Sequence, residues 1–119
     1  MNDAAFETQK ERIRLLFAKW TKILDISHRY LMVYDWLRTP IKDHERAVMV
    51  VHASWKYLDA HVEINCEKAE FLDDVRIERV VVHECMHILL NEMREDDIDH
   101  EERVCSEMAD IIMGLVQNP

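Results

Sequence analysis

The segment that most constrains this chain is an apolar run that carries three polar residues inside it. Residues 80–90 read Val-Val-Val-His-Glu-Cys-Met-His-Ile-Leu-Leu, and only His83, Glu84 and His87 among them are strongly polar. A helix that is apolar nearly all round is typical of a buried position. Burying two imidazoles and a carboxylate costs free energy unless each group finds a partner, and one bound cation would serve all three. The segment therefore predicts a buried helix with a metal site.

The spacing of the two histidines predicts how they would act. Four residues apart on a helix, His83 and His87 lie one turn above the other on one face, close enough to hold a single Zn²⁺. The zinc would lower the pKa of a bound water towards about 7, and Glu84, about 100° round the helix, could remove its proton. On a strand the histidines would be about 13 Å apart, too far to hold one ion. The β-branched residues 80–82 favour a strand and are therefore the weak point of the helix prediction. The alternative is a pair of core histidines satisfied by backbone and carboxylate groups.

Hydrophobic periodicity predicts an α+β fold in the order α-β-β-β-α-α. Apolar residues at helical spacing indicate helices, the first of them capped by Asn2 or Asp3, and runs rich in aromatic and β-branched residues indicate strands. The strands would form a three-stranded, largely antiparallel sheet packed on the helices. The predicted elements are helices over residues 4–25, 73–93 and 99–116 and strands over residues 30–37, 46–55 and 61–66.

Length and composition limit the classes of protein to consider. The chain has 119 residues, 49% of them hydrophobic, which predicts a single domain over residues 1–119. Its formal net charge of −9 repels phosphate backbones, so we expect no nucleic-acid partner. The longest uncharged apolar run is too short to span a bilayer, so we expect no membrane partner. The three cysteines show no C-x-x-C spacing and no signal-type start precedes them, which predicts a reducing compartment such as the cytoplasm.

A catalytic zinc site needs a third protein ligand, which the motif itself does not supply. The pattern H-E-x-x-H-x-x-G-x-x-H is not met, because Leu90 and Met93 occupy the glycine and last histidine positions. The last predicted helix offers carboxylates, and its apolar stripe places Glu101 in the middle of the buried arc and Glu102 near the edge. Glu101 is therefore the first choice and Glu102 the reserve. The weaker alternatives on this helix are Asp99, His100 and Glu107.

The predicted elements and the motif His83-Glu84-Cys85-Met86-His87 resemble the gluzincins, in particular the minimal gluzincins and the short predicted metallopeptidases of phages and prophages. The resemblance covers about residues 28–116, and His83-Glu84-x-x-His87 is its specific motif. It implies a small zincin-like domain in which two motif histidines and a Glu from the next helix bind zinc. By position, His83 and His87 are the ligands and Glu84 the general base, while Glu101 and the adjacent Glu102 compete for the third ligand position.

The function implied is a zinc metallopeptidase that hydrolyses a peptide or protein substrate through a metal-activated water. Larger zincins present an edge strand along which a peptide pairs, and residues 61–66 are the candidate strand here. The alternative is a non-catalytic protein-binding module stabilised by a metal, whose ion would be held by four protein ligands. We expect a monomer or small homo-oligomer in the cytoplasm of a bacterium or of a phage-infected host.

Overall fold

The chain folds into a three-stranded sheet with helices on one of its faces. The computed structural model describes residues 1–91 and 98–117. Within these ranges, none of the helices combines the length and the apolar composition that crossing a lipid bilayer requires. In chain order the elements are α1 (Asp3–Ile23), β1 (Leu31–Leu37), β2 (Met49–Ser54), β3 (Asp59–Asn65), α2 (Cys66–Ala69), α3 (Asp74–Leu90) and α4 (Ile98–Gln117).

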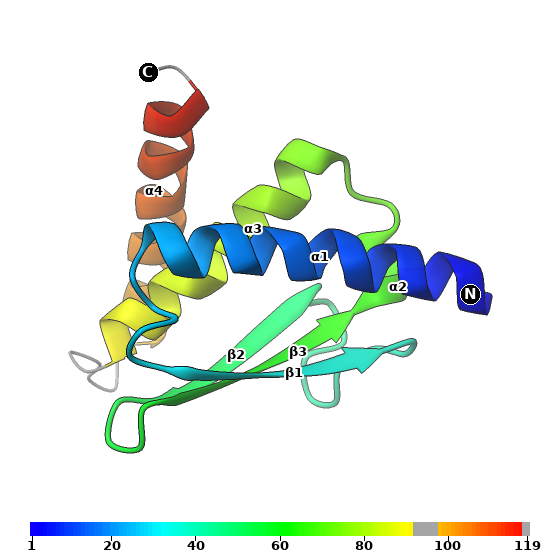
Figure 1. Cartoon of the computed structure of the whole chain (residues 1–119), viewed down its shortest axis with the longest axis horizontal. Helices are drawn as coiled ribbons and strands as arrows, with labels where there is room; N and C mark the ends of the chain where they lie inside the picture. Colours follow the sequence, from blue (N-terminus) through cyan, green and yellow to red (C-terminus); the bar gives the residue numbers. More distant parts are fainter. Residues whose placement is uncertain (92–97, 118–119) are drawn as a thin grey trace.

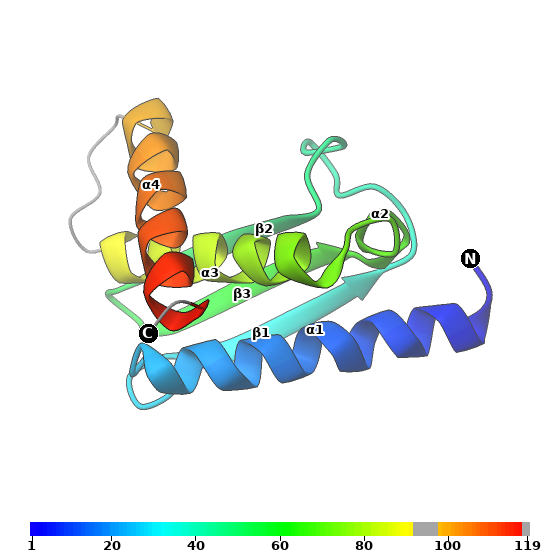
Figure 2. The same ribbon diagram turned by 90° about the horizontal axis from the view of Figure 1, so that it is seen from above.

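Helices α1 and α3 lie on the same face of the sheet, and α4 crosses the C-terminal end of α3 (Figure 1, Figure 2). The core between the sheet and the two helices includes Phe17 and Trp20 of α1, which are fully buried. The ring of Phe17 contacts that of Tyr34 on β1, with centroids 5.3 Å apart. α1 begins after Asn2, one of the two predicted N-caps, whose side chain accepts a hydrogen bond from the Ala5 N–H. The predicted first helix is therefore confirmed.

The sheet is mixed, with β3 in its centre. Its order is β1-β3-β2, because β3 pairs parallel to β1 and antiparallel to β2. The prediction of an α+β fold with a three-stranded sheet on helices is confirmed, but a largely antiparallel sheet is wrong for the β1–β3 pair. β1 and β2 run in opposite directions with the width of one strand between them. β3 returns from β2 through residues 55–58 and fills this gap, so it must run parallel to β1.

The predicted strand over residues 61–66 differs from β3 in both its end and its position. β3 stops at Asn65, because the Asn65 side chain accepts the Lys68 N–H at 3.1 Å and caps the short helix α2, which was not predicted. As the central strand, β3 is hydrogen-bonded on both sides. The prediction that residues 61–66 offer a free edge to a peptide is therefore wrong.

The Arg12 side chain ties α1 to the turn between α2 and α3. Its guanidinium donates to the carbonyl oxygen of Leu72 at 2.8 Å and to that of Ala69 at 3.4 Å. It also donates to Gln9 Oε1 at 3.0 Å and to Asp74 Oδ1 at 3.2 Å. Because Asp74 is the first residue of α3, Arg12 positions the start of the helix that carries the two histidines.

Replacement of Arg12 should destabilise the fold more than replacement of a nearby exposed arginine. Arg12→Ala leaves two half-buried carbonyl groups without their charged donor, so we expect the free energy of unfolding to fall by about 1–3 kcal/mol. Arg14→Ala, which removes the same charge but only an exposed pair with Glu11, should cost less than about 1 kcal/mol. Urea unfolding followed by circular dichroism measures both values. Equal losses in the two variants would contradict this role of Arg12.

Candidate metal centre

His83 and His87 can share one ion only if they lie on a helix, and α3 is that helix. It begins after Asp73, whose side chain accepts the Arg76 N–H at 2.8 Å and so caps the first turn. The β-branched residues 80–82 are helical, and the last two of them have no exposed surface. Packing in the core thus overrides the low helix propensity of β-branched side chains. The helix predicted for the motif is confirmed.

The imidazoles of His83 and His87 meet edge to face, with ring centroids 4.8 Å apart. Their Nε2 atoms are 3.1 Å apart. The carboxylate of Glu102 lies against both rings: Oε2 is 3.1 Å from Nε2 of His83, and Oε1 is 2.8 Å from Nε2 of His87. One ligand atom from each of these residues therefore lies within 4.8 Å of the others, a set suited to holding one metal ion.

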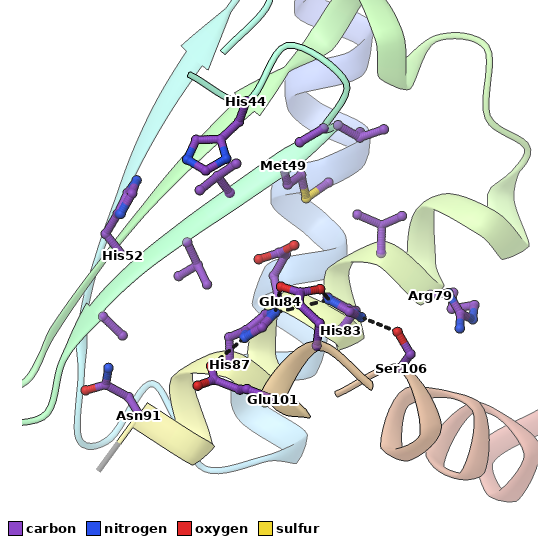
Figure 3. A pocket seen from close by; sticks show the side chains of 17 residues that line it. His44, Met49, His52, Arg79, His83, Glu84, His87, Asn91, Glu101 and Ser106 are labelled. Carbon is purple, nitrogen blue, oxygen red and sulfur yellow. Dashed lines mark hydrogen bonds and ion pairs between the residues drawn. The ribbon is translucent and has the colours of Figure 1, made fainter. Parts of the chain in front are cut away.

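The other nitrogen of each ring has its own partner (Figure 3). Nδ1 of His87 is 2.7 Å from Oε1 of Glu101, and Nδ1 of His83 is 3.3 Å from Oγ of Ser106. A histidine that donates its Nδ1–H to such a partner presents the lone pair of Nε2 to an ion. Burial lowers the pKa of His83, and the neighbouring His87 lowers it further, which favours the neutral ring that a metal needs.

Glu101 and Glu102 therefore lie on opposite edges of the His87 ring. Glu102, the reserve choice, reaches the two Nε2 atoms, whereas Glu101, the first choice, reaches Nδ1 of His87. Glu107 forms an exposed ion pair with Arg103 away from the site. Ser106 was missed by the sequence reasoning, although its position one turn after Glu102 was an available signal. The side chains of the alternatives Asp99 and His100 lie outside the described residues.

The paired histidines, Glu101, Glu102 and Ser106 line a cleft of about 560 Å³ between β2 and the helices α3 and α4. One wall consists of residues 47–53 and the opposite wall carries His83, Glu84 and His87. Figure 3 shows Met49 at one end of the cleft and Asn91 at the other. The cleft thus follows the length of β2 and passes directly over the paired histidines.

β2 is an edge strand, and its free side faces this cleft. The Asn65 N–H donates to the Val48 carbonyl at 2.8 Å, which sets the phase of the antiparallel hydrogen bonds between β2 and β3. Backbone groups alternate in direction along such a strand. Those of Met49, Val51 and Ala53 therefore point away from β3. The cleft has a row of backbone donors and acceptors along one wall.

Glu84 and Asn91 each occupy one N–H group of that edge. The Val51 N–H donates to the Glu84 carboxylate, and the Trp55 N–H donates to Oδ1 of Asn91 at 2.8 Å. Glu84 is only 7% exposed, and burial, together with the charge of Glu102, raises its pKa to about 8. The carboxyl group predicted to be a general base is thus buried in the wall of the cleft and has the basicity of a group that titrates near neutral pH.

Comparisons of the chain with protein-family models, with curated proteins and with solved structures found no significant match. The resemblance to gluzincins therefore stays a prediction that rests on the motif. What the chain can do chemically has to be inferred from its own site, which brings together two imidazoles and one carboxylate beside a buried second carboxylate.

Glu84 should make the metal-free protein less stable as the pH rises. Its pKa is 4.5 as an ordinary carboxyl group and about 8 in the fold, so between these values the folded state holds a proton that the unfolded state has lost. The free energy of unfolding should therefore fall over this pH range. In Glu84→Gln the fall should be smaller, by on the order of a few kcal/mol, because this side chain does not titrate. Urea unfolding of chelator-treated proteins at about pH 5 and about pH 8 gives both slopes, and identical slopes would contradict the raised pKa.

Proposed function

We propose that this chain is a zinc-dependent peptidase of the gluzincin type with a zincin-like fold, in which His83, His87 and Glu102 hold the ion and Glu84 is the general base. The observation that carries the proposal is the convergence of two Nε2 atoms and one carboxylate on the wall of a cleft. The same cleft contains the buried Glu84 and the free edge of β2. Metal ligands, a base and a surface for an extended peptide thus lie together.

The donor set fits Zn²⁺ by its chemistry. Two neutral imidazole nitrogens and one carboxylate oxygen are a common set of three protein ligands in catalytic zinc sites, where the fourth position is left open. Among the described residues, no fourth His, Cys, Asp or Glu joins this set. A purely structural zinc normally has four protein ligands. The set therefore favours catalysis over the alternative of a metal-stabilised binding module.

Glu84 supports a hydrolytic role. When bound, zinc would polarise the carbonyl group of a peptide bond and make a water molecule more acidic. The Glu84 carboxylate can take a proton from the attacking water and pass it to the leaving amine. A general base acts best when its pKa lies near the working pH, and burial brings Glu84 to that range. The substrate would be a peptide or protein, and the cytoplasmic location stays a prediction.

Metal analysis of five proteins tests the ligand set. Wild type and Glu84→Gln should each hold at least about one zinc per chain and the same amount as each other, because Glu84 is not a ligand. His87→Ala and Glu102→Gln should lose most of it. Glu101→Gln should keep a zinc that binds about 10–100 times more weakly, since Glu101 orients a ligand without binding the ion itself. Elemental analysis after dialysis against dilute zinc gives the content, and competition with a chromophoric chelator gives the affinity.

The same proteins test the activity. Glu84→Gln should lower kcat for cleavage of a denatured protein substrate at least about 100-fold although its zinc is retained. No zinc in wild type, or full zinc in His87→Ala, would refute the metal site. A zinc-loaded wild type without peptidase activity would leave the metal-stabilised binding module as the better description. If Glu101→Gln loses its zinc and Glu102→Gln keeps it, the third ligand is Glu101.

We further propose that the peptide pairs with β2, which takes the place of residues 61–66 as the substrate strand. The backbone groups of Met49 and Ala53 and the Val51 carbonyl face the cleft, and an extended peptide could form main-chain hydrogen bonds with them, whereas the Val51 N–H is held by Glu84. The Trp55 N–H is already bound by Asn91, so the paired segment would end at Ala53 on that side. This places the peptide directly opposite the histidines of α3.

Removal of the Ala53 N–H should weaken the binding of the peptide substrate and leave the fold intact. Proline is tolerated where the N–H of an edge strand is not part of the ladder, so Ala53→Pro should keep its zinc and its circular dichroism spectrum. We expect kcat/KM to fall about tenfold, because one main-chain hydrogen bond to the peptide is lost. Ala53→Gly retains the N–H and should stay near wild type. Equal activity in the two variants would argue against pairing at this edge.

A further inference from the structure

A second cluster of metal-binding side chains lies on the other edge of the His87 ring. Nδ1 of His87, a carboxylate oxygen of Glu101 and Sγ of Cys105 all lie within 4.8 Å of one another. Glu101 and Cys105 are one turn apart on α4, so the packing of α4 on α3 assembles the cluster. Tetrahedral ions with bonds of about 2.0–2.3 Å hold their ligand atoms within about 4 Å of one another. Small side-chain rotations would therefore close the site.

We propose that His87 Nδ1, Glu101 and Cys105 form a second ion site, which takes a thiophilic divalent ion such as Co²⁺, Cd²⁺ or a further Zn²⁺. The thiolate is the ligand that selects the ion, because soft sulfur favours these ions over Mg²⁺ and Ca²⁺. The first site, by contrast, offers only nitrogen and oxygen from His83, His87 and Glu102. The two sites share one imidazole and differ in ligand chemistry.

Burial makes this cluster more than a chance surface grouping. Cys105 has no exposed surface, and the side chains of Glu101 and His87 are 11% and 12% exposed. Charged ligands in such surroundings are stable only when opposite charge balances them. The other two cysteines, Cys66 and Cys85, are also buried, but neither belongs to a metal-binding group within the described residues. Cys105 is thus distinguished by its neighbours.

Charge and protons balance when the second ion binds. The Cys105 thiol and the Nδ1–H of His87 each release a proton to solvent, and both atoms then bind the ion together with a Glu101 oxygen. With both sites filled, four ligands with one negative charge each balance two divalent ions. These ligands are Glu101, Glu102, the Cys105 thiolate and the doubly bound His87 ring. The two ions and their protein donors together are therefore electroneutral.

Cobalt spectroscopy distinguishes the two sites, because a thiolate bound to Co²⁺ gives an intense near-ultraviolet charge-transfer band that nitrogen and oxygen ligands do not give. Metal-free protein kept under reducing conditions is titrated with Co²⁺. We expect weak visible bands from the first site, followed by the near-ultraviolet band, and two ions per chain at saturation. Cys105→Ser and Cys105→Ala should lose the near-ultraviolet band and retain the visible bands with one ion per chain. Glu101→Gln should raise the Kd of the second ion at least about tenfold.

Cys85→Ser is the matched control, since Cys85 is equally buried, lies inside the motif and has no place in the cluster. It should keep the near-ultraviolet band. Absence of that band in wild type, or its survival in both Cys105 variants, would overturn the second site. Visible bands without the near-ultraviolet band would refute the second site alone. A near-ultraviolet band that rises with the first equivalent of Co²⁺ and saturates at one ion per chain, with no ion bound by the Cys105 variants, would refute the first site, and with it the proposed function, while supporting the second.

Discussion

The contact between two carboxylates of α4 and two imidazoles of α3 is the interaction on which the site depends. Glu101 and Glu102 are neighbours in the chain, yet they reach opposite edges of the His87 ring. Neighbouring side chains on a helix point about 100° apart, so the ring is held between them. α4 packs chiefly on α3 among the described elements, which makes these polar contacts part of what places the helix.

Burial gives this contact its chemical character. It lowers the pKa of His83 and raises that of Glu84 to about 8, so ionisable groups are kept where their charged forms are costly. Each group is satisfied by another, and no buried side-chain nitrogen or oxygen in the described part of the chain lacks a hydrogen-bond partner. Clusters of perturbed groups lining a cleft are typical of functional sites. The stability that such groups cost is consistent with a role in binding an ion.

The order of the sheet decides what faces that cluster. Because β3 fills the space between β1 and β2, β2 becomes an edge strand, and its free backbone groups meet α3 across the cleft. The hydrogen bond from the Val51 N–H to Glu84 joins the two walls at the level of the histidines. With β2 in the centre of the sheet, its N–H groups would be used by neighbouring strands, and no extended segment could pair beside His83 and His87.

Local patterns in the sequence determined the helices α1 and α3, the three strands and the shared helical face of His83 and His87, because periodicity and burial are properties of short segments. Only the tertiary structure decided the sheet order, since the hydrophobic pattern of a strand does not name its neighbours. It also decided the places of Glu101 and Glu102. The apolar stripe of α4 correctly turned Glu101 inward, where it is 11% exposed, but which nitrogen of His87 a carboxylate reaches depends on how α4 crosses α3, and no single segment contains that angle.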